Sequence, residues 1–117
     1  MKNLKLIIVI CLISMGCISC MSSKSLYTWH NYEDASYVYT KKQTDKTLDK
    51  LIKEYKYIIS HQKGIRKAVP PGIYAEYAYL LIKMNNKEEG IMMLRKEVEL
   101  YPESKIFIGR IIKQLEK

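Results

Sequence analysis

Apolar and polar residues recur with the spacing of amphipathic helices through most of the chain after residue 31. This periodicity predicts helices over 32–41, 45–63, about 71–84, 87–100 and 103–115. The second expected helix shows the pattern most clearly, with an apolar stripe formed by Leu48, Leu51, Ile52, Tyr55, Ile58 and Ile59. Its charged residues, Glu54 among them, are expected on or near the solvent side. No segment has the length and alternation of a convincing β-strand, so the sequence predicts an all-α fold.

Capping and breaking residues indicate where these helices begin and end. Asn31 and Thr44 are expected N-caps of the first two helices, because a short polar side chain can accept a bond from the first-turn backbone. Gly64 is expected to end the second helix. The pair Pro70-Pro71 cannot continue a helix, and Pro102 is expected to end the fourth helix and open the fifth.

Residues 1–20 follow a different pattern, which is typical of an export signal. Lys2 and Lys5 precede an uncharged, almost wholly apolar run over 6–13, and the small residue Gly16 comes directly before Cys17. Such an arrangement predicts a secretory signal peptide, and its apolar run is much shorter than the roughly 20 residues needed to span a bilayer. The cysteine after the small residue indicates a bacterial lipoprotein signal, in which the thiol takes a lipid and the chain is cut just before it.

The lipidated residue is expected to be Cys17, with Cys20 after Ser19 as the alternative. Two other interpretations stay open, an uncleaved signal anchor and a Cys-x-x-Cys metal or redox pair. The expected organisation is a signal peptide over 1–16, a lipidated N-terminus and flexible tether over 17–25, and a helical repeat-like domain over 26–117. Neither candidate cysteine is followed by an acidic residue, so outer-membrane anchoring facing the periplasm is expected.

Residues 69–102 carry the most specific internal pattern, that of a tetratricopeptide repeat. When Pro102 takes the place of the proline of that repeat, its large and small positions fall on Tyr74, Tyr77, Ala78, Leu81, Gly90 and Leu94. One repeat cannot bury its own faces. We therefore expect a short helical-hairpin array of one to two repeats with the last helix as a C-terminal cap, and a generic helical hairpin is the alternative.

Glu97 departs from the repeat pattern, because a small residue is expected at its position. Two interpretations follow from the residues. Glu97 is either a partly exposed helix residue or a buried carboxylate that accepts bonds from tyrosine hydroxyls or from the backbone before the third helix, since an unpaired carboxylate is costly to bury. A structural role is favoured over a catalytic one.

Composition and charge narrow the classes of partner. The chain has 117 residues and a formal net charge of +8, of which Lys2 and Lys5 contribute two, so the chain after the expected cleavage site carries +6. An export signal argues against nucleic acid as the partner of this basic surface. Acidic glycans or anionic lipids are the alternative ligands. Ten tyrosines beside one phenylalanine suit half-buried helix faces and interfaces.

Three blocks of the chain resemble a known family of small bacterial lipoproteins, that of domain of unknown function 4810. They are Leu26-Tyr27-x-Trp29-x-x-Tyr32-Glu33, Val69-Pro70-Pro71-Gly72-Ile73-Tyr74-Ala75 and the segment from Glu97 to Pro102-Glu103-Ser104. The sequence departs from the family at His30, where glycine is usual, and at Glu76, where histidine is common. The resemblance implies an outer-membrane lipoprotein in an envelope complex with a curli-secretion-channel-like lipoprotein and a second small lipoprotein.

The residues carry little catalytic chemistry. His30 and His61 lack metal-ligand spacing, Ser104 lacks the frame of a nucleophile, and no glycine-rich phosphate loop is present among five glycines. We therefore expect no enzyme activity, no cofactor and no metal. The favoured function is a protein-interaction module in an envelope or secretion-type assembly, and binding of an acidic glycan or anionic lipid is the alternative. The candidate partner-binding residues are Tyr27, Trp29, Tyr32, Tyr74 and Glu97.

Overall fold

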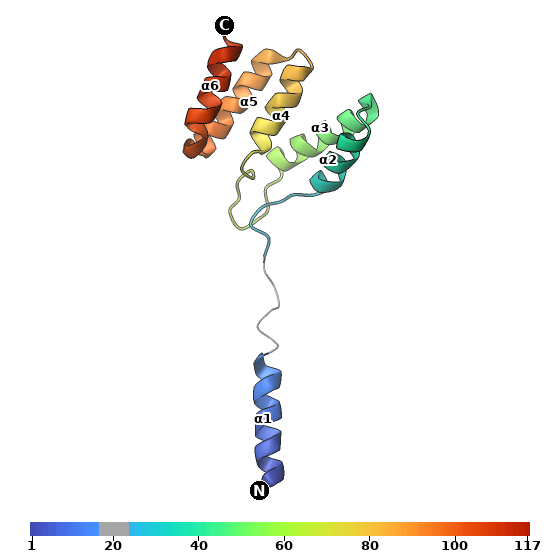
Figure 1. Ribbon diagram of the computed structural model, residues 1–117, viewed down its shortest axis with the longest axis vertical. Coiled ribbons are helices and arrows are strands. Elements are labelled where there is room, and N and C mark those ends of the chain that lie inside the picture. Colours follow the sequence, from blue (N-terminus) through green and yellow to red (C-terminus); the bar gives the residue numbers. More distant parts are fainter. Residues whose placement is uncertain (17–23) are drawn as a thin grey trace.

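The computed structural model describes residues 1–16 and 24–117, and it is all-helical over these residues (Figure 1). The elements are α1 (Lys2–Gly16), α2 (Tyr32–Lys41), α3 (Asp45–Ser60), α4 (Ile73–Lys83), α5 (Lys87–Leu100), the 3-10 helix η2 (Pro102–Ser104) and α6 (Lys105–Leu115). The all-α prediction is confirmed.

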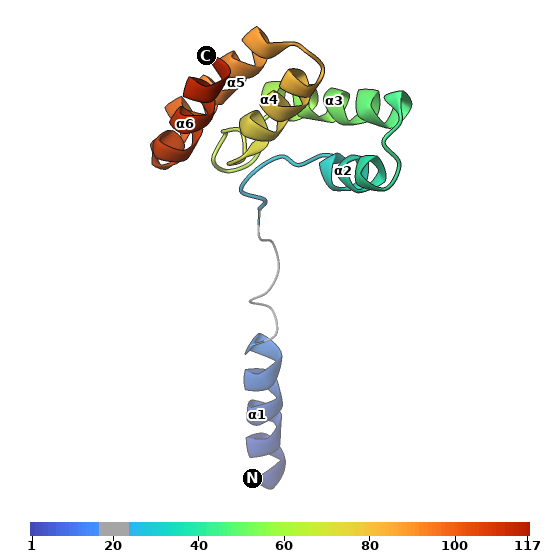
Figure 2. The same cartoon turned by 45° about the horizontal axis from the view of Figure 1, so that its top comes forward.

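The helices from α2 onward form an array of two hairpins and a final helix. Helices α2 and α3 pack as one hairpin, α4 and α5 as the next, and α3 joins the two through α4. Helix α6 packs on α5 at the far end, and both views show α4, α5 and α6 side by side (Figures 1 and 2). This is the helical-hairpin array with a C-terminal capping helix that the repeat pattern predicts.

The small residues of the repeat pattern lie at the contact between α4 and α5. A Cβ atom added to Gly90 would lie 2.6 Å from Cγ1 of Ile82 and 3.1 Å from the carbonyl oxygen of Ala78. Ala78 is fully buried, and Tyr77, Leu81 and Leu94 are buried around it. The signature residues therefore pack as the sequence predicts.

Several helix boundaries agree with the sequence prediction and one cap does not. Thr44 caps α3 in a capping box, because its Oγ1 accepts from the Thr47 backbone N–H while the Thr47 hydroxyl oxygen accepts from the Thr44 N–H. Asn31 occupies the N-cap position of α2, but its side chain makes no capping hydrogen bond. Helix α4 begins at Ile73, directly after Gly72, whose φ of +90° lies in the left-handed region that glycine adopts without strain.

The prediction that Gly64 ends the second helix is wrong. Helix α3 ends at Ser60, and Gly64 lies in the following loop. A Cβ atom on Gly64 would lie 2.4 Å from the carbonyl oxygen of Leu26, so this glycine allows two backbone segments to touch. Beside that contact the Ile65 and Arg66 N–H groups donate to the carbonyl oxygens of Ser25 and Leu26 at 3.1 Å each. The segment before α2 is thus held on the loop after α3.

The placement of Glu54 on the solvent side is also wrong. Glu54 is only 9% exposed, because the segment before α2 folds over it. Its Oε2 lies 2.7 Å from His30 Nδ1 and accepts from the Asn31 backbone N–H at 3.3 Å. The charge of Glu54 by itself suggests a solvent-exposed position. Its two partners lower the free-energy cost of burying the carboxylate.

Helix α1 makes no packing contact with another helix within the part of the chain that the structure describes. Most of its large apolar side chains are at least half exposed. None of the described helices is both long and apolar enough to cross a bilayer. The two lipidation candidates, Cys17 and Cys20, lie outside the described residues, so the signal-peptide and tether predictions stay predictions.

Candidate functional site

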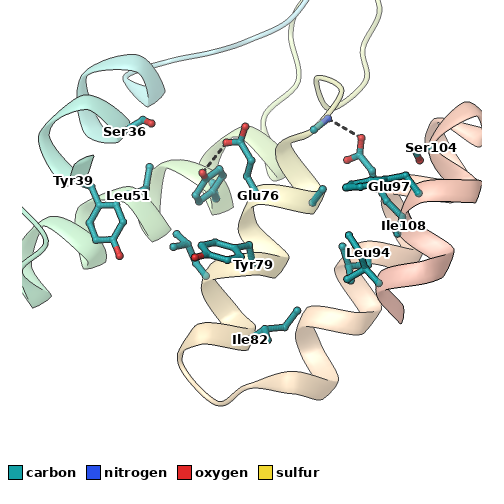
Figure 3. A pocket seen from close by; sticks show the side chains of 16 residues that line it. Ser36, Tyr39, Leu51, Glu76, Tyr79, Ile82, Leu94, Glu97, Ser104 and Ile108 are labelled. Carbon is teal, nitrogen blue, oxygen red and sulfur yellow. Dashed lines mark hydrogen bonds between the residues drawn. The ribbon is translucent and has the colours of Figure 1, made fainter. Parts of the chain in front are cut away.

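A cavity of about 580 Å³ lies among α2, α4 and α6, and α3 and α5 contribute to its floor (Figure 3). We call it the docking groove. Its walls include Tyr39 from α2, Tyr79 and Ile82 from α4, and Phe107 and Ile111 from α6. Tyr79 and Phe107 are 64% and 70% exposed, although both are large and largely apolar. Large exposed apolar side chains gathered around one cavity are typical of an interaction site.

One carboxylate of the groove, that of Glu76, connects both hairpins. Its Oε2 accepts a hydrogen bond from the Tyr32 hydroxyl and another from the Tyr55 hydroxyl at 3.0 Å. Burial raises the pKa of Tyr55, and the charge of Glu76 raises it further. The pKa of Tyr32 is raised for the same two reasons, burial and then Glu76. Both hydroxyls therefore stay protonated as donors, and they fix the Glu76 carboxylate beside the groove.

The second carboxylate, that of Glu97, is buried, with only 3% of the residue exposed. Its Oε1 accepts from the Gly72 backbone N–H at 2.7 Å, which ties α5 to the start of α4 (Figure 3). This confirms the interpretation of a buried carboxylate that accepts from the backbone before the third predicted helix. A negative charge at that place also interacts favourably with the N-terminal end of the α4 dipole. The other oxygen, Oε2, is buried and has no hydrogen-bond partner in the described structure.

The groove differs in charge from the rest of the protein. The chain contains 20 lysines and arginines, yet none is among the described residues that line the groove. The ionisable lining groups are instead the carboxylates of Glu76 and Glu97 and the phenols of tyrosine. The groove is therefore apolar and acidic within a basic protein.

Comparison with protein families identifies the chain. A family model described as domain of unknown function (DUF4810) matches residues 26–111. The chain belongs to the DUF4810 family. The matched range includes α2 to α5 and more than half of α6, and thus both hairpins and all of the described residues that line the groove. Searches of curated proteins and of solved structures give no significant match.

In this DUF4810 protein, the predicted aromatic residues lie largely outside the groove. The Tyr27 and Trp29 rings pack edge to face with centroids 6.4 Å apart, and Trp29 also contacts the Tyr32 ring at 5.7 Å. Tyr27 and Trp29 line a separate depression beside the loop after α3. The groove is therefore not filled by the aromatic segment before α2. Tyr74 is half-buried, with the Lys96 ammonium group 5.9 Å from its ring centroid, and it lines no wall of the groove.

Of the five predicted residues, the structure brings only Glu97 to the groove wall, while Tyr32 reaches its edge through Glu76. The sequence analysis missed Tyr79 and Phe107. A usable signal for Tyr79 was present, because Ala75, Tyr79 and Ile82 share one helix face by i+4 and i+3 spacing, distinct from the face of Tyr77, Ala78 and Leu81.

His30 has a structural role in the DUF4810 domain. Its φ of +47° is a left-handed conformation, which suits the glycine that the resembled family usually has there. The imidazole contacts Glu54 and lies over the Tyr57 ring, with centroids 4.1 Å apart. These contacts offset the cost of the left-handed backbone conformation at His30. No group of three or more His, Cys, Asp or Glu side chains arranged to hold a metal occurs among the described residues.

Proposed function

We propose that this DUF4810 protein is a lipid-anchored, non-enzymatic docking module that binds a protein segment in the groove between α2, α4 and α6. The observation that carries the proposal is the exposure of Tyr79 on α4 and Phe107 on α6, two helices that line one apolar cavity. A monomeric domain gains nothing in stability from leaving such side chains in water, whereas a partner that covers them gains their burial.

The size and shape of the groove suit a peptide or helix as its occupant. Its volume of about 580 Å³ falls within the range of roughly 300–1,000 Å³ that ligand sites commonly have. Walls made of three helices favour a segment that inserts apolar side chains between them, which is the helix-in-groove mode of recognition. Arrays of helical hairpins often use such surfaces for proteins.

The cellular setting of the proposal comes from the sequence. The predicted signal peptide and the lipidation candidates Cys17 and Cys20 support attachment at the outer membrane, facing the periplasm. The family resemblance supports a curli-secretion-channel-like lipoprotein and a second small lipoprotein as partners. A lipid anchor would raise the local concentration of the groove near such neighbours.

A site-specific photo-crosslinking experiment tests this function. A photo-reactive phenylalanine analogue placed at Tyr79 in the lipidated protein should crosslink an envelope protein, whereas the same analogue at Tyr37 should not. Tyr37 is a matched control, because it is 58% exposed against 64% for Tyr79 and lies outside the groove. Recovery of only the uncrosslinked monomer with the analogue at Tyr79 would contradict the proposal, and equal crosslinking from both positions would place the contact elsewhere.

A second candidate function rests on a basic face beside the segment before α2. Lys24, Lys63 and Lys67 surround the depression that contains Trp29, and Ile65, which also lines it, is 58% exposed. Cationic groups next to exposed apolar side chains suit the headgroup region of an anionic membrane. This face adjoins the tether, which would bring it to the lipid surface.

Vesicle binding tests this second function. The chain from residue 24 onward should sediment with vesicles that contain phosphatidylglycerol, less so as salt is raised. The double substitution Lys63→Glu/Lys67→Glu should abolish this binding, and Lys46→Glu/Lys53→Glu on α3 serves as a control of equal charge change. Equal losses in the two variants would mean that net charge alone drives the association.

A further inference from the structure

We infer that the docking groove recognises a segment that carries a lysine or arginine among apolar side chains, and that this cation pairs with Glu97. The inference rests on the proposed docking function and names the chemistry of the occupant. It follows from three observations, which are the unpartnered oxygen of Glu97, the commitment of the Ser104 and Tyr101 hydroxyls to other acceptors, and the charge of the groove.

The unpartnered oxygen is the first observation. Glu97 is 97% removed from solvent, and only its Oε1 has a donor, the Gly72 N–H. Buried polar atoms without a partner are uncommon in folded proteins, and a carboxylate oxygen is among the most costly of them. An atom of this kind on the wall of a cavity points to a donor that arrives from outside the chain.

Two neighbouring hydroxyl donors, those of Ser104 and Tyr101, already donate to other acceptors. Ser104 lines the same part of the groove, but its hydroxyl donates to the Tyr101 carbonyl oxygen at 2.7 Å. The Tyr101 hydroxyl, in turn, donates to the Val69 carbonyl oxygen at 2.6 Å. Either could reach Glu97 only by giving up a bond that it makes already. In the described part of the chain Oε2 of Glu97 thus has no donor, and these two hydroxyls are not free to supply one.

The charge of the groove selects a cation as that donor. The two acidic groups of the lining are Glu76, which is exposed and whose Oε2 accepts from two tyrosine hydroxyls, and Glu97, which is buried and has a donor only at Oε1. No described lining residue is basic, so the carboxylates face no cation of their own chain. An anionic segment would be repelled here, and a wholly apolar segment would deepen the burial of an unpaired charge.

The apolar walls also suit the shape of a lysine or arginine side chain. The stem of such a residue can lie along the apolar walls while its charged end reaches the carboxylate. The exposed aromatic rings of Phe107 and Tyr79 can make cation–π contacts with a charged group that enters the groove towards Glu97. Charge-assisted hydrogen bonds in water-poor surroundings are stronger than neutral ones, so this pair would select among apolar segments.

Selection of random peptides tests the inference without a known partner. The chain from residue 24 onward, which excludes the unpacked helix α1, is used to select phage-displayed peptides long enough for about three helical turns. Glu97→Gln is selected in parallel, with Glu99→Gln as the control, because Glu99 is exposed on the same helix and lies outside the groove lining. Each variant is checked by circular dichroism before selection.

We expect peptides from the wild-type and Glu99→Gln selections to combine apolar residues with a recurrent lysine or arginine. This result would be specific, because a protein of net charge +6 would otherwise favour acidic peptides. The recurrent cation should be absent from peptides selected by Glu97→Gln. Replacing it by norleucine in one selected peptide should weaken binding to the wild-type protein about tenfold or more, which requires no variant of the protein to fold.

Two contrary results have different meanings. Groove-binding peptides without a recurrent cation, or with the same cation in the Glu97→Gln selection, would overturn the inference and leave the docking function intact. A lack of enriched peptides, or peptides that bind a Tyr79→Asp/Phe107→Asp variant as well as they bind wild type, would overturn the docking function itself.

Discussion

Replacement of Glu97 by alanine tests whether a single carboxylate holds the start of α4. The substitution removes the acceptor of the 2.7 Å bond from the Gly72 N–H, the charge beside the N-terminal end of α4, and the volume of a buried side chain. It also removes Oε2, the buried oxygen without a partner. The first three losses destabilise the fold, and the last change stabilises it.

The magnitudes of these contributions determine whether Glu97→Ala raises or lowers the free energy of unfolding. The charge-assisted bond contributes about 1.5–3 kcal/mol, and the interaction with the helix dipole about 0.3–1 kcal/mol. Removal of the unpaired oxygen returns about 1–3 kcal/mol. These contributions nearly cancel, so the loss of packing determines the net change in stability. Truncation of a large buried side chain to alanine typically costs about 2 kcal/mol or more. We therefore expect Glu97→Ala to lower the stability by about 2 kcal/mol.

Glu97→Gln separates charge from packing. Glutamine keeps the volume and an oxygen that can accept from Gly72, while the weaker bond and the relief of the buried charge oppose each other. We expect its stability to stay within about 0.5 kcal/mol of wild type, like that of an ordinary surface substitution. This near neutrality is also what makes Glu97→Gln a suitable probe of peptide recognition.

Thermal unfolding followed by circular dichroism measures both variants. For a domain of this size, about 2 kcal/mol corresponds to a fall in Tm of roughly 10 °C for Glu97→Ala. Amide exchange at Gly72 should speed up in the same variant, because its N–H loses its acceptor. Glu99→Ala, on the exposed side of α5, is the control. A wild-type Tm for Glu97→Ala, or an equal fall for Glu97→Gln, would refute the reasoning.

Three further predictions concern the backbone and the tyrosines. Gly72→Ala should lower the free energy of unfolding by about 1–2 kcal/mol in a denaturant titration. An added Cβ meets no atom within 4 Å, so only the φ of +90° opposes the substitution. An unchanged midpoint would contradict this. Gly64→Ala should expose the segment before α2 to proteolysis, since its Cβ would meet the Leu26 carbonyl oxygen, and wild-type protease resistance would count against that contact. Burial raises the pKa of Tyr101 from 10.0 to about 12, so the folded state binds its proton more tightly and stability should fall as the pH rises from 10 to 12. Tyr101→Phe should flatten that fall, and a slope equal to that of wild type would assign it to other groups.

The helices were predictable from the sequence because their determinants are local. Thr44 and Pro102 mark ends by their own chemistry, and the apolar stripe of α3 follows from its period. The packing of α4 on α5 was predictable too, because Gly90 and Ala78 belong to a known repeat pattern. Even the bond of Glu97 to the backbone before α4 was among the alternatives that the sequence left open.

The remaining features depend on contacts between distant parts of the chain. Glu54 is buried by a segment more than twenty residues earlier in sequence, which helical periodicity cannot detect. Gly64 resembles a helix stop in sequence, but its role depends on Leu26. Periodicity also identifies an apolar face without showing whether a neighbour covers it, and this is why the exposed Tyr79 and Phe107 were not predicted as site residues.

The separation of charge over the domain connects the two proposed surfaces. The depression next to the segment before α2 is lined by Lys24, Lys63 and Lys67 and by no described acidic residue, whereas the groove is lined by Glu76 and Glu97 and by no described basic residue. A single ligand class cannot satisfy both, because a polyanion suited to the first would be repelled by the second. The two candidate functions are therefore compatible only as different faces with different partners.

Salt should weaken binding at the exposed basic face strongly and binding at the buried Glu97 carboxylate much less, because screening acts chiefly on charges in contact with solvent. The salt dependence of any ligand captured by this protein would thus indicate which of the two faces it occupies.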